Sequence, residues 1–478
     1  MRVRIGGVLD DALALMAIFE TIALGQLVLY PFSFYTVGSS AWYQAQAFRW
    51  LVLASPLLLV VLLYSWVVIL ALRVSRNLSV RINSFVRAFS EALKRLDTQV
   101  SSTEEFFVLQ HPRLLLIMAM AVAALLGALP YWPGLNPSGS IVGTDTSSYI
   151  NWTSQMLARP FPQAISYAFS QADSGLRPLP LIIFYSIASL GVSPQLTVEF
   201  SPIILGPLLS LSLFFFVNAG FGNKGAAAIS ALVGCFSFNV TVGIWAGYLA
   251  NWMAIIIAYF FLASFFLFER SKRRTVLLPP LFLLSLALLL THPWTWALIL
   301  ATTFVYAIIR SGDQRKLLTI SPVILILGGI IVDFVKNQVA GGTTLAADLG
   351  TKAPVFGISQ FLMFWPNVWT ALTVFYNGLL GNAVLLGLSA LCFAAIQFRG
   401  KVASMSFCWV ACASIPFALL NAFHQTRLIY DLPIPPLAAL GTLWVMSRAG
   451  GGNLRASLIL LVILLFSANY AVGSIIQA

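Results

Sequence analysis

Long apolar stretches separated by short polar segments dominate the chain. Many of these stretches reach about 18 residues or more, which is the length a helix needs to cross the hydrocarbon core of a bilayer. The pattern therefore predicts an all-α, polytopic membrane protein with about 13 transmembrane helices. The predicted spans are 11–31, 48–72, 112–129, 199–218, 225–242, 246–268, 275–291, 293–310, 317–335, 377–397, 403–421, 428–446 and 455–474.

The connection 130–198 has a pattern of its own. Its apolar stretch 180–191 gives about a dozen helical residues, or roughly 18 Å, which is too short to cross the core. We predict that this stretch is a helix lying at the membrane interface. Residues 146–171 mix aromatic and polar positions, and predict one or two amphipathic helices broken at Arg159-Pro160. The connection is therefore expected to be a structured cap.

The composition agrees with this class and the charge predicts the orientation. Hydrophobic residues make up 59% of the 478, whereas charged residues make up 9%. The net charge of +12 could indicate a nucleic-acid partner, but a cytoplasmic N-terminus places 21 of the 27 lysines and arginines on the cytoplasmic side. This asymmetry follows the positive-inside rule, so we predict no nucleic-acid partner and an outer location for residues 130–198.

The spans divide the chain into four predicted regions. Residues 1–111 form a two-span extension with a basic amphipathic stretch from 73 to 96, for which a membrane-surface helix or a partner contact is the plainest interpretation. The other regions are a core at 112–335, a Gly/Thr/Ala-rich lid-like segment at 336–376 and C-terminal transmembrane helices at 377–478. The first apolar run lacks a convincing cleavage site, so we expect it to be retained.

The cysteines lie in apolar runs and are expected to be packing residues. Together with the retained hydrophobic start, unpaired cysteines are typical of a protein of a prokaryotic plasma membrane. The four are Cys235, Cys392, Cys408 and Cys412.

Asp145, in the segment "GTDTSSYINWT", is the most informative ionisable residue. It follows a predicted span closely, and ionisable groups near a bilayer often have a function. Asp is also a favoured N-cap, so this residue could simply cap the helix that begins after it. The sequence leaves both interpretations open.

Other ionisable residues are predicted to reach the same membrane face. Arg177 and Arg427 are suited to bind phosphate, although each could pair with an acid or extend to lipid headgroups. His424 precedes Arg427 by one helical turn, while His292 lies in "THPWTW", where an interfacial structural role competes. Asp173 and Asp431 are weaker candidates, and Asp431 could hold Arg427 in place.

Four segments carry a resemblance to a known family. They are "GTDTSSY", "RPLPLIIFY", "GFGNKGAAAISALVGCFSFN" and "THPWTW". Together with a long first outer loop after an inside-to-outside helix, they make the chain resemble the GT-C integral membrane glycosyltransferases. This family includes oligosaccharyltransferase catalytic subunits, protein O-mannosyltransferases and aminoarabinose transferases. The resemblance covers roughly residues 112 to 335 and extends more loosely to about 447.

The resemblance implies transfer of a sugar from a polyprenyl-phosphate donor to an acceptor glycan, lipid or protein at the outer membrane face. It assigns Asp145 as the catalytic carboxylate, which would also hold a divalent cation such as Mg or Mn if the enzyme uses one. It assigns Arg177, His292, His424, Arg427 and Tyr149 to substrate binding, with Asp431 and Asp173 supporting them. The second outer loop, "NVTVGIWAGYLANW", departs from the family because it lacks the acid that several relatives have there.

Two other function classes remain open. A transporter or flippase for a lipid-linked or small substrate would place polar residues near the midplane, often on broken helices and in repeated halves. A non-catalytic membrane scaffold is compatible with the N-terminal extension. The sequence has no phosphate-binding Gly-rich loop with Lys, which argues against a nucleotide-driven pump.

Overall fold

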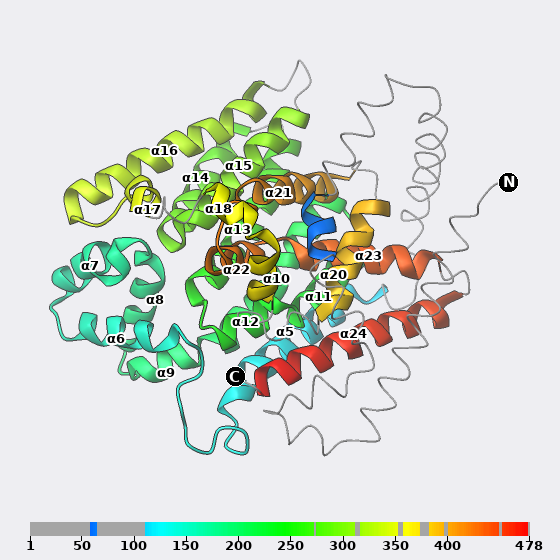
Figure 1. Cartoon of the computed structure of the whole chain (residues 1–478), viewed down its shortest axis with the longest axis horizontal. Helices are drawn as coiled ribbons and strands as arrows, with labels where there is room; N and C mark the ends of the chain where they lie inside the picture. Colours follow the sequence, from blue (N-terminus) through cyan, green and yellow to red (C-terminus); the bar gives the residue numbers. More distant parts are fainter. Residues whose placement is uncertain are drawn as a thin grey trace.

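The computed structural model describes residues 58–64, 110–271, 274–310, 316–351, 357–372, 382–395, 400–448 and 452–476. These residues form helices joined by turns, with no strand among them (Figure 1). The all-α prediction is confirmed for this part of the chain. The predicted span 11–31, most of 48–72 and the basic stretch 73–96 lie outside the described residues.

Eight helical segments of the described chain are long and apolar enough to cross a membrane, so the protein is a multi-pass membrane protein. They match the predicted spans beginning at residues 112, 199, 225, 246, 275, 293, 317 and 455. They consist of α5 (Pro112–Ala128) with η4 (Leu129–Tyr131), α9 (Pro194–Glu199) with α10 (Ser201–Phe221), α11 (Lys224–Cys235) with α12 (Phe238–Trp245), α13 (Leu249–Arg270), α14 (Arg274–Thr291), α15 (Pro293–Arg310), α16 (Lys316–Ala340) and α24 (Gly452–Ile476).

The predicted span 428–446 is not one continuous helix. The chain forms α22 (Ala422–Tyr430) and α23 (Ile434–Arg448), which pass the length and hydropathy test only as a pair bent by 57°. Pro433 lies in the break, where it cannot donate a backbone hydrogen bond and disfavours a helical conformation in the residue before it. Counting this pair, the described residues contain up to nine candidate spans, and the total of 13 stays a prediction because the predicted span 11–31 and most of 48–72 lie outside them.

Of the other two C-terminal spans, the one at 403–421 is shorter than predicted and the one at 377–397 is described only in part. The predicted span 403–421 is α21 (Lys401–Phe417), and α20 (Ala383–Ala395) is the described part of 377–397. Cys235, Cys392 and Cys408 are buried inside the helical bundle, as expected of packing residues, while Cys412 is half-buried.

The bundle is organised around α11 and α12. Nearly every residue in the apolar window of these two helices is buried, with Phe236 half-buried, whereas α5 and α16 turn large apolar side chains outward. Leu125 of α5 and Ile331 of α16 are examples, with exposed fractions of 70% and 62%. An apolar outer surface around a close-packed centre is what a lipid solvent requires.

The cap, residues 130–198, follows α5 and precedes α10 along the chain. Its helices are gathered at one edge of the molecule, next to α16 and α17 (Figure 1). The predicted break at Arg159-Pro160 is confirmed, because one helix ends at Leu157 and the next begins at Phe161. The cap helices are α6 (Thr146–Leu157), α7 (Phe161–Ser170), η5 (Ala172–Gly175), α8 (Pro178–Ala188) and α9.

The lid-like segment 336–376 contains short helices in its described part. It begins with the last turn of α16 and continues through α17 (Leu345–Thr351), α18 (Ile358–Leu362) and α19 (Phe364–Thr370). Nζ of Lys336 donates to the carbonyl of Gly175 over 3.0 Å, and the Thr343 amide donates to the carbonyl of Ser174 over 2.8 Å. These bonds join the start of the segment to the cap.

Gly127 controls the contact of α5 with α10. A Cβ atom at this position would lie 2.7 Å from the backbone nitrogen of Ile203, which cannot move independently of its helix. We expect Gly127→Val to lower the free energy of unfolding by about 1–3 kcal/mol, the usual cost of overpacking. Thermal unfolding in detergent measures this effect, and Ala121→Val on the exposed face of α5 is the control. Equal stability of the two variants would contradict this view of the packing.

Candidate functional site

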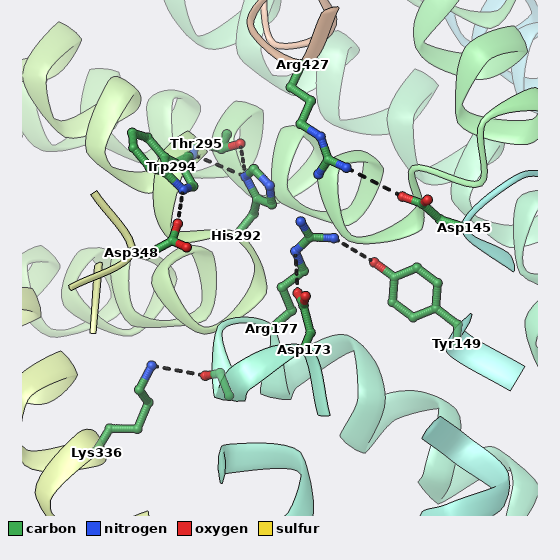
Figure 2. A network of polar contacts seen from close by, with 11 residues as sticks. Asp145, Tyr149, Asp173, Arg177, His292, Trp294, Thr295, Lys336, Asp348 and Arg427 are labelled. Carbon is green, nitrogen blue, oxygen red and sulfur yellow. Dashed lines mark hydrogen bonds and ion pairs between the residues drawn. The ribbon is translucent and has the colours of Figure 1, made fainter. Parts of the chain in front are cut away.

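Asp145 stands at the N-cap position of α6, but its side chain makes no capping hydrogen bond. Its Oδ2 instead lies 3.7 Å from Nη2 of Arg427, which belongs to α22 (Figure 2). The side chains are partly exposed, 33% for Asp145 and 21% for Arg427. The carboxylate therefore faces a cation from a distant segment, and the helix-cap interpretation of its side chain is wrong.

Arg427 is held by aromatic rings and by the anchoring of α22. The carbon of its guanidinium lies 5.1 Å from the ring centres of both Tyr248 and Phe423, a cation–π geometry. At the end of α22, the Tyr430 hydroxyl donates to the carbonyl of Asn239, and the Asn239 amide donates back to the carbonyl of Tyr430, both over 2.7 Å. This reciprocal pair fixes α22 against α12.

Arg177 enters the same site from the cap. Its Nε lies 2.9 Å from Oδ2 of Asp173, and its Nη1 donates to the Tyr149 hydroxyl over 3.3 Å. Figure 2 shows Arg177 beside Asp145 and Arg427. The structure thus brings together five of the predicted site residues. Four come from the cap and one comes from α22: Asp145, Tyr149, Asp173, Arg177 and Arg427.

A left-handed turn positions Arg177. Asp173 and Ser174 have φ values of 46° and 57°, a conformation that non-glycine residues seldom adopt. Such strain persists only where surrounding contacts hold it. The bonds from Lys336 and Thr343 to this turn supply that restraint, and Asp333 pairs with Lys336 over 2.9 Å. The start of the lid-like segment therefore supports the turn that carries Asp173.

The remaining candidates have other contacts. His292 Nδ1 lies 2.7 Å from Oγ1 of Thr295, and this hydroxyl donates to Oδ2 of Asp431 over 2.6 Å. Asp431 is thus hydrogen-bonded to Thr295, and the predicted pairing with Arg427 is not among the ion pairs of the described residues. Nδ1 of His424 lies 2.8 Å from Oδ1 of Asn421, which is the N-cap residue of α22.

The second interspan loop contributes residues that the sequence did not reveal. The Asp145 amide donates to the carbonyl of Ala246 over 3.0 Å, and Tyr248 stacks on Arg427. Gly247, with φ +68°, lets the two backbones approach, because a Cβ there would lie 2.8 Å from the Thr146 nitrogen. The loop lacks an acid, yet it supports both members of the Asp145–Arg427 pair. In the sequence, only the small residues Ala246 and Gly247 indicate that this loop can pass close to the backbone at Asp145 and Thr146.

The electrostatics of the site favour proton exchange at Asp145. Burial raises the pKa of this carboxyl above its usual range, while the attraction of Arg427 and then Arg177 opposes the rise and the repulsion of Asp173 adds to it. A carboxylate with a raised pKa is a stronger base than an ordinary one. The site therefore combines a proton acceptor with two cations.

The residues fit a protein-held divalent cation poorly. Asp145 and Asp173 each already face an arginine, and the described part of the chain contains no group of three or more His, Cys, Asp or Glu side chains arranged as ligands. A divalent cation at Asp145 stays a prediction, and no step below depends on it.

No protein-family model and no curated protein matches this sequence. The function must therefore be argued from the geometry of the site.

Gly247→Ala tests whether close backbone approach positions Asp145. Alanine would be strained at φ +68° and would also crowd the Asp145 nitrogen, which lies 3.0 Å from the built Cβ. Gly191→Ala is a matched control, since its φ is +97° but nothing lies within 4 Å of its Cβ. We expect Gly247→Ala to lower the unfolding free energy by about 1–3 kcal/mol more than the control does. Equal losses in thermal unfolding would contradict the crowding argument.

Proposed function

We propose that the protein is a membrane glycosyltransferase that moves a sugar from a polyprenyl-phosphate donor to a hydroxyl acceptor. The observation that carries the proposal is the placement of the Asp145 carboxylate beside two arginines that come from different segments. The carboxylate suits the acceptor, whose hydroxyl must lose a proton to a base. The arginines suit the donor, whose phosphate needs cations to bind it. The resemblance of the sequence to GT-C enzymes supports the same assignment.

Arg427 and Arg177 are the proposed phosphate-binding groups. Guanidinium groups bind phosphate oxygens through forked hydrogen bonds and keep their charge at any physiological pH. Nε of Arg427 is buried and has no hydrogen-bond partner among the described residues, so this arginine has donor capacity left for a ligand. Tyr149, which accepts a bond from Arg177, is proposed to orient that arginine and the sugar.

The proposed step is a direct displacement. The acceptor oxygen forms a bond to the anomeric carbon of the sugar while the bond from that carbon to the phosphate oxygen breaks. The proton of the acceptor hydroxyl passes to Asp145, and the polyprenyl phosphate leaves with the electron pair. Charge that develops on the leaving phosphate is stabilised by the two arginines. We place this site at the outer face of a plasma membrane, with the N-terminus in the cytoplasm.

Transport of a lipid-linked or small substrate is the second candidate. The bend of 57° between α22 and α23 is the observation that favours it, since Arg427 lies one turn before the break. Broken helices with polar residues near the break are typical of transporter substrate sites. We prefer the transferase because Asp145 and Arg177 lie at the starts of α6 and α8, in the connection between two spans, whereas transporter sites typically lie near the midplane.

Replacement of Asp145 tests the transferase directly. We expect purified protein in liposomes to transfer radiolabelled sugar from polyprenyl-phosphate donors, and Asp145→Asn to lose about 10²–10⁴ of the rate, as removal of a general base does. Glu199→Gln, a change at a buried acid at the end of α9 that makes no described contact with Arg427, is the control and should keep its rate. The melting temperature of each variant must show that it is folded.

The same preparations separate the two functions. Retained transfer in a folded Asp145→Asn variant would remove this carboxylate from the mechanism. Movement of a labelled lipid-linked sugar across the liposome membrane, with no transfer from any donor, would favour the transporter.

The pH profile tests the electrostatics of Asp145. A base must be ionised, so kcat should fall as the pH is lowered through the raised pKa of this carboxyl, at a higher pH than for an ordinary aspartate. Arg427 lowers this pKa, so Arg427→Gln should raise it further and move the acidic limb of the kcat profile to higher pH. Measurement at saturating donor separates this shift from weaker binding. An acidic limb that stays in place would contradict the assignment.

A further inference from the structure

A cluster of basic side chains lies at the end of α13 that is remote from the proposed site. Tyr248, which stacks on Arg427, directly precedes α13, whereas Glu269 and Arg270 are the last two residues of this helix. The helix has 22 residues, so its two ends are about 33 Å apart. The basic cluster consists of Arg270, Arg274 at the start of α14, Arg310 at the end of α15 and Lys401 at the start of α21. It therefore lies near the membrane face opposite the proposed site.

A buried carboxylate holds the basic cluster together. The side chain of Glu269 is 1% exposed, and its Oε2 lies 2.8 Å from Nζ of Lys401. The Tyr306 hydroxyl donates to the same oxygen over 3.1 Å. Nη2 of Arg274 donates to the backbone carbonyl of Glu269 over 3.2 Å. These contacts join the ends of α13 and α15 to the starts of α14 and α21.

Positive charge is in excess in the basic cluster. Arg270 and Arg310 lie close enough to Lys401 to repel its charge. The three arginines of the cluster form no ion pair within the described part of the chain, and the buried Nε of Arg274 has no hydrogen-bond partner there. The connections 272–273 and 311–315, outside the described residues, add Lys272, Arg273, Arg315 and one acid, Asp313. An anion bound among these groups would offset their mutual repulsion.

Apolar side chains beside the basic cluster indicate that this anion belongs to a lipid. Leu267 precedes Arg270 by three residues and so shares its face of α13, and its exposed fraction is 52%. Val276 near the start of α14 and Ile309 near the end of α15 are 67% and 59% exposed. Exposed apolar side chains of membrane-spanning helices face acyl chains. A ligand at the cluster thus meets cations at the helix ends and an apolar surface next to them.

We propose that the basic cluster binds the anionic headgroup of a phospholipid at the membrane face opposite the proposed site. Guanidinium groups donate forked hydrogen bonds to phosphate oxygens, and basic pockets between transmembrane helices bind anionic headgroups. The three arginines supply the phosphate contacts, while Lys401 stays paired with Glu269 and joins α21 to α13. The lipid site does not depend on the proposed transferase activity.

Lipid binding by the purified full-length protein tests the proposal. We expect delipidated protein in detergent to bind phosphatidylglycerol at least about tenfold more tightly than phosphatidylcholine, as measured by native mass spectrometry. The double variant Arg274→Gln/Arg310→Gln should bind phosphatidylglycerol about 25-fold more weakly, because each basic side chain near an anionic lipid contributes a factor of about five. Equal affinity of the unmodified protein for the two lipids would overturn the proposal.

A second double variant controls for the overall charge. Arg113→Gln/Arg455→Gln removes two exposed cations at the starts of α5 and α24, which pack against each other and make no described contact with the basic cluster. Both positions are predicted to lie at the same membrane face as the cluster. This control should keep its affinity for phosphatidylglycerol. Equal weakening in the two double variants would show a response to net charge alone and would rule out a site at the cluster.

A third double variant guards against loss of folding. Arg274→Lys/Arg310→Lys keeps both charges and removes the forked donors, so it should bind phosphatidylglycerol with an affinity between those of the unmodified protein and the glutamine variant. The melting temperature of each variant without lipid shows whether it is folded. Failure of a folded lysine variant to prefer phosphatidylglycerol over the glutamine variant's level would contradict the electrostatic contribution.

A soluble headgroup distinguishes a lipid from a free phosphate ester. Glycerophosphoglycerol carries the same phosphate without acyl chains, and at equal concentration it should fail to displace phosphatidylglycerol, because the apolar side chains beside the cluster contribute to lipid binding. Displacement at equal concentration would assign the site to a soluble phosphate ester and overturn the lipid assignment. Sugar transfer enters neither measurement, so failure of this inference and failure of the proposed function are separate outcomes.

Discussion

The architecture of the site depends on one contact, the approach of the Asp145 carboxylate to the Arg427 guanidinium at 3.7 Å. The first residue belongs to the cap and the second to α22, so this contact joins the cap to the C-terminal part of the bundle. Taking either charge from water without its partner is costly, which favours the arrangement in which they meet. The aromatic rings that flank Arg427 and the backbone bond that fixes Asp145 restrict both groups to this meeting point.

Backbone constraints make the contact possible. Gly247 allows the second interspan loop to pass against the start of α6, and the left-handed turn at residues 173–174 brings Arg177 to the same place. The break at Pro433 separates α22 from α23 and lets α22 lie at an angle to the bundle. Close backbone approach at Gly247, the left-handed turn at 173–174 and the break at Pro433 thus bring the charged groups together.

The sequence predicted the features that come from local composition. Apolar length located eight spans, Pro160 located the break in the cap, and the scarcity of charge directed attention to Asp145 and Arg427. It did not predict the bend at Pro433, because the span 428–446 was predicted from its apolar length alone. It also missed Thr295 and Tyr248, whose partners His292, Asp431 and Arg427 are brought together only by tertiary packing.

A double-mutant cycle on the unfolding free energy tests the Asp145–Arg427 contact most directly. The cycle compares the unmodified protein with Asp145→Asn, Arg427→Gln and the double variant, in the same detergent and at the same salt concentration. Residues in contact show interaction energies of about 0.5–3 kcal/mol, and we predict a value in the lower part of this range because both side chains are partly exposed. Losses that add to within about 0.3 kcal/mol would show that the two residues act independently, and would contradict the account.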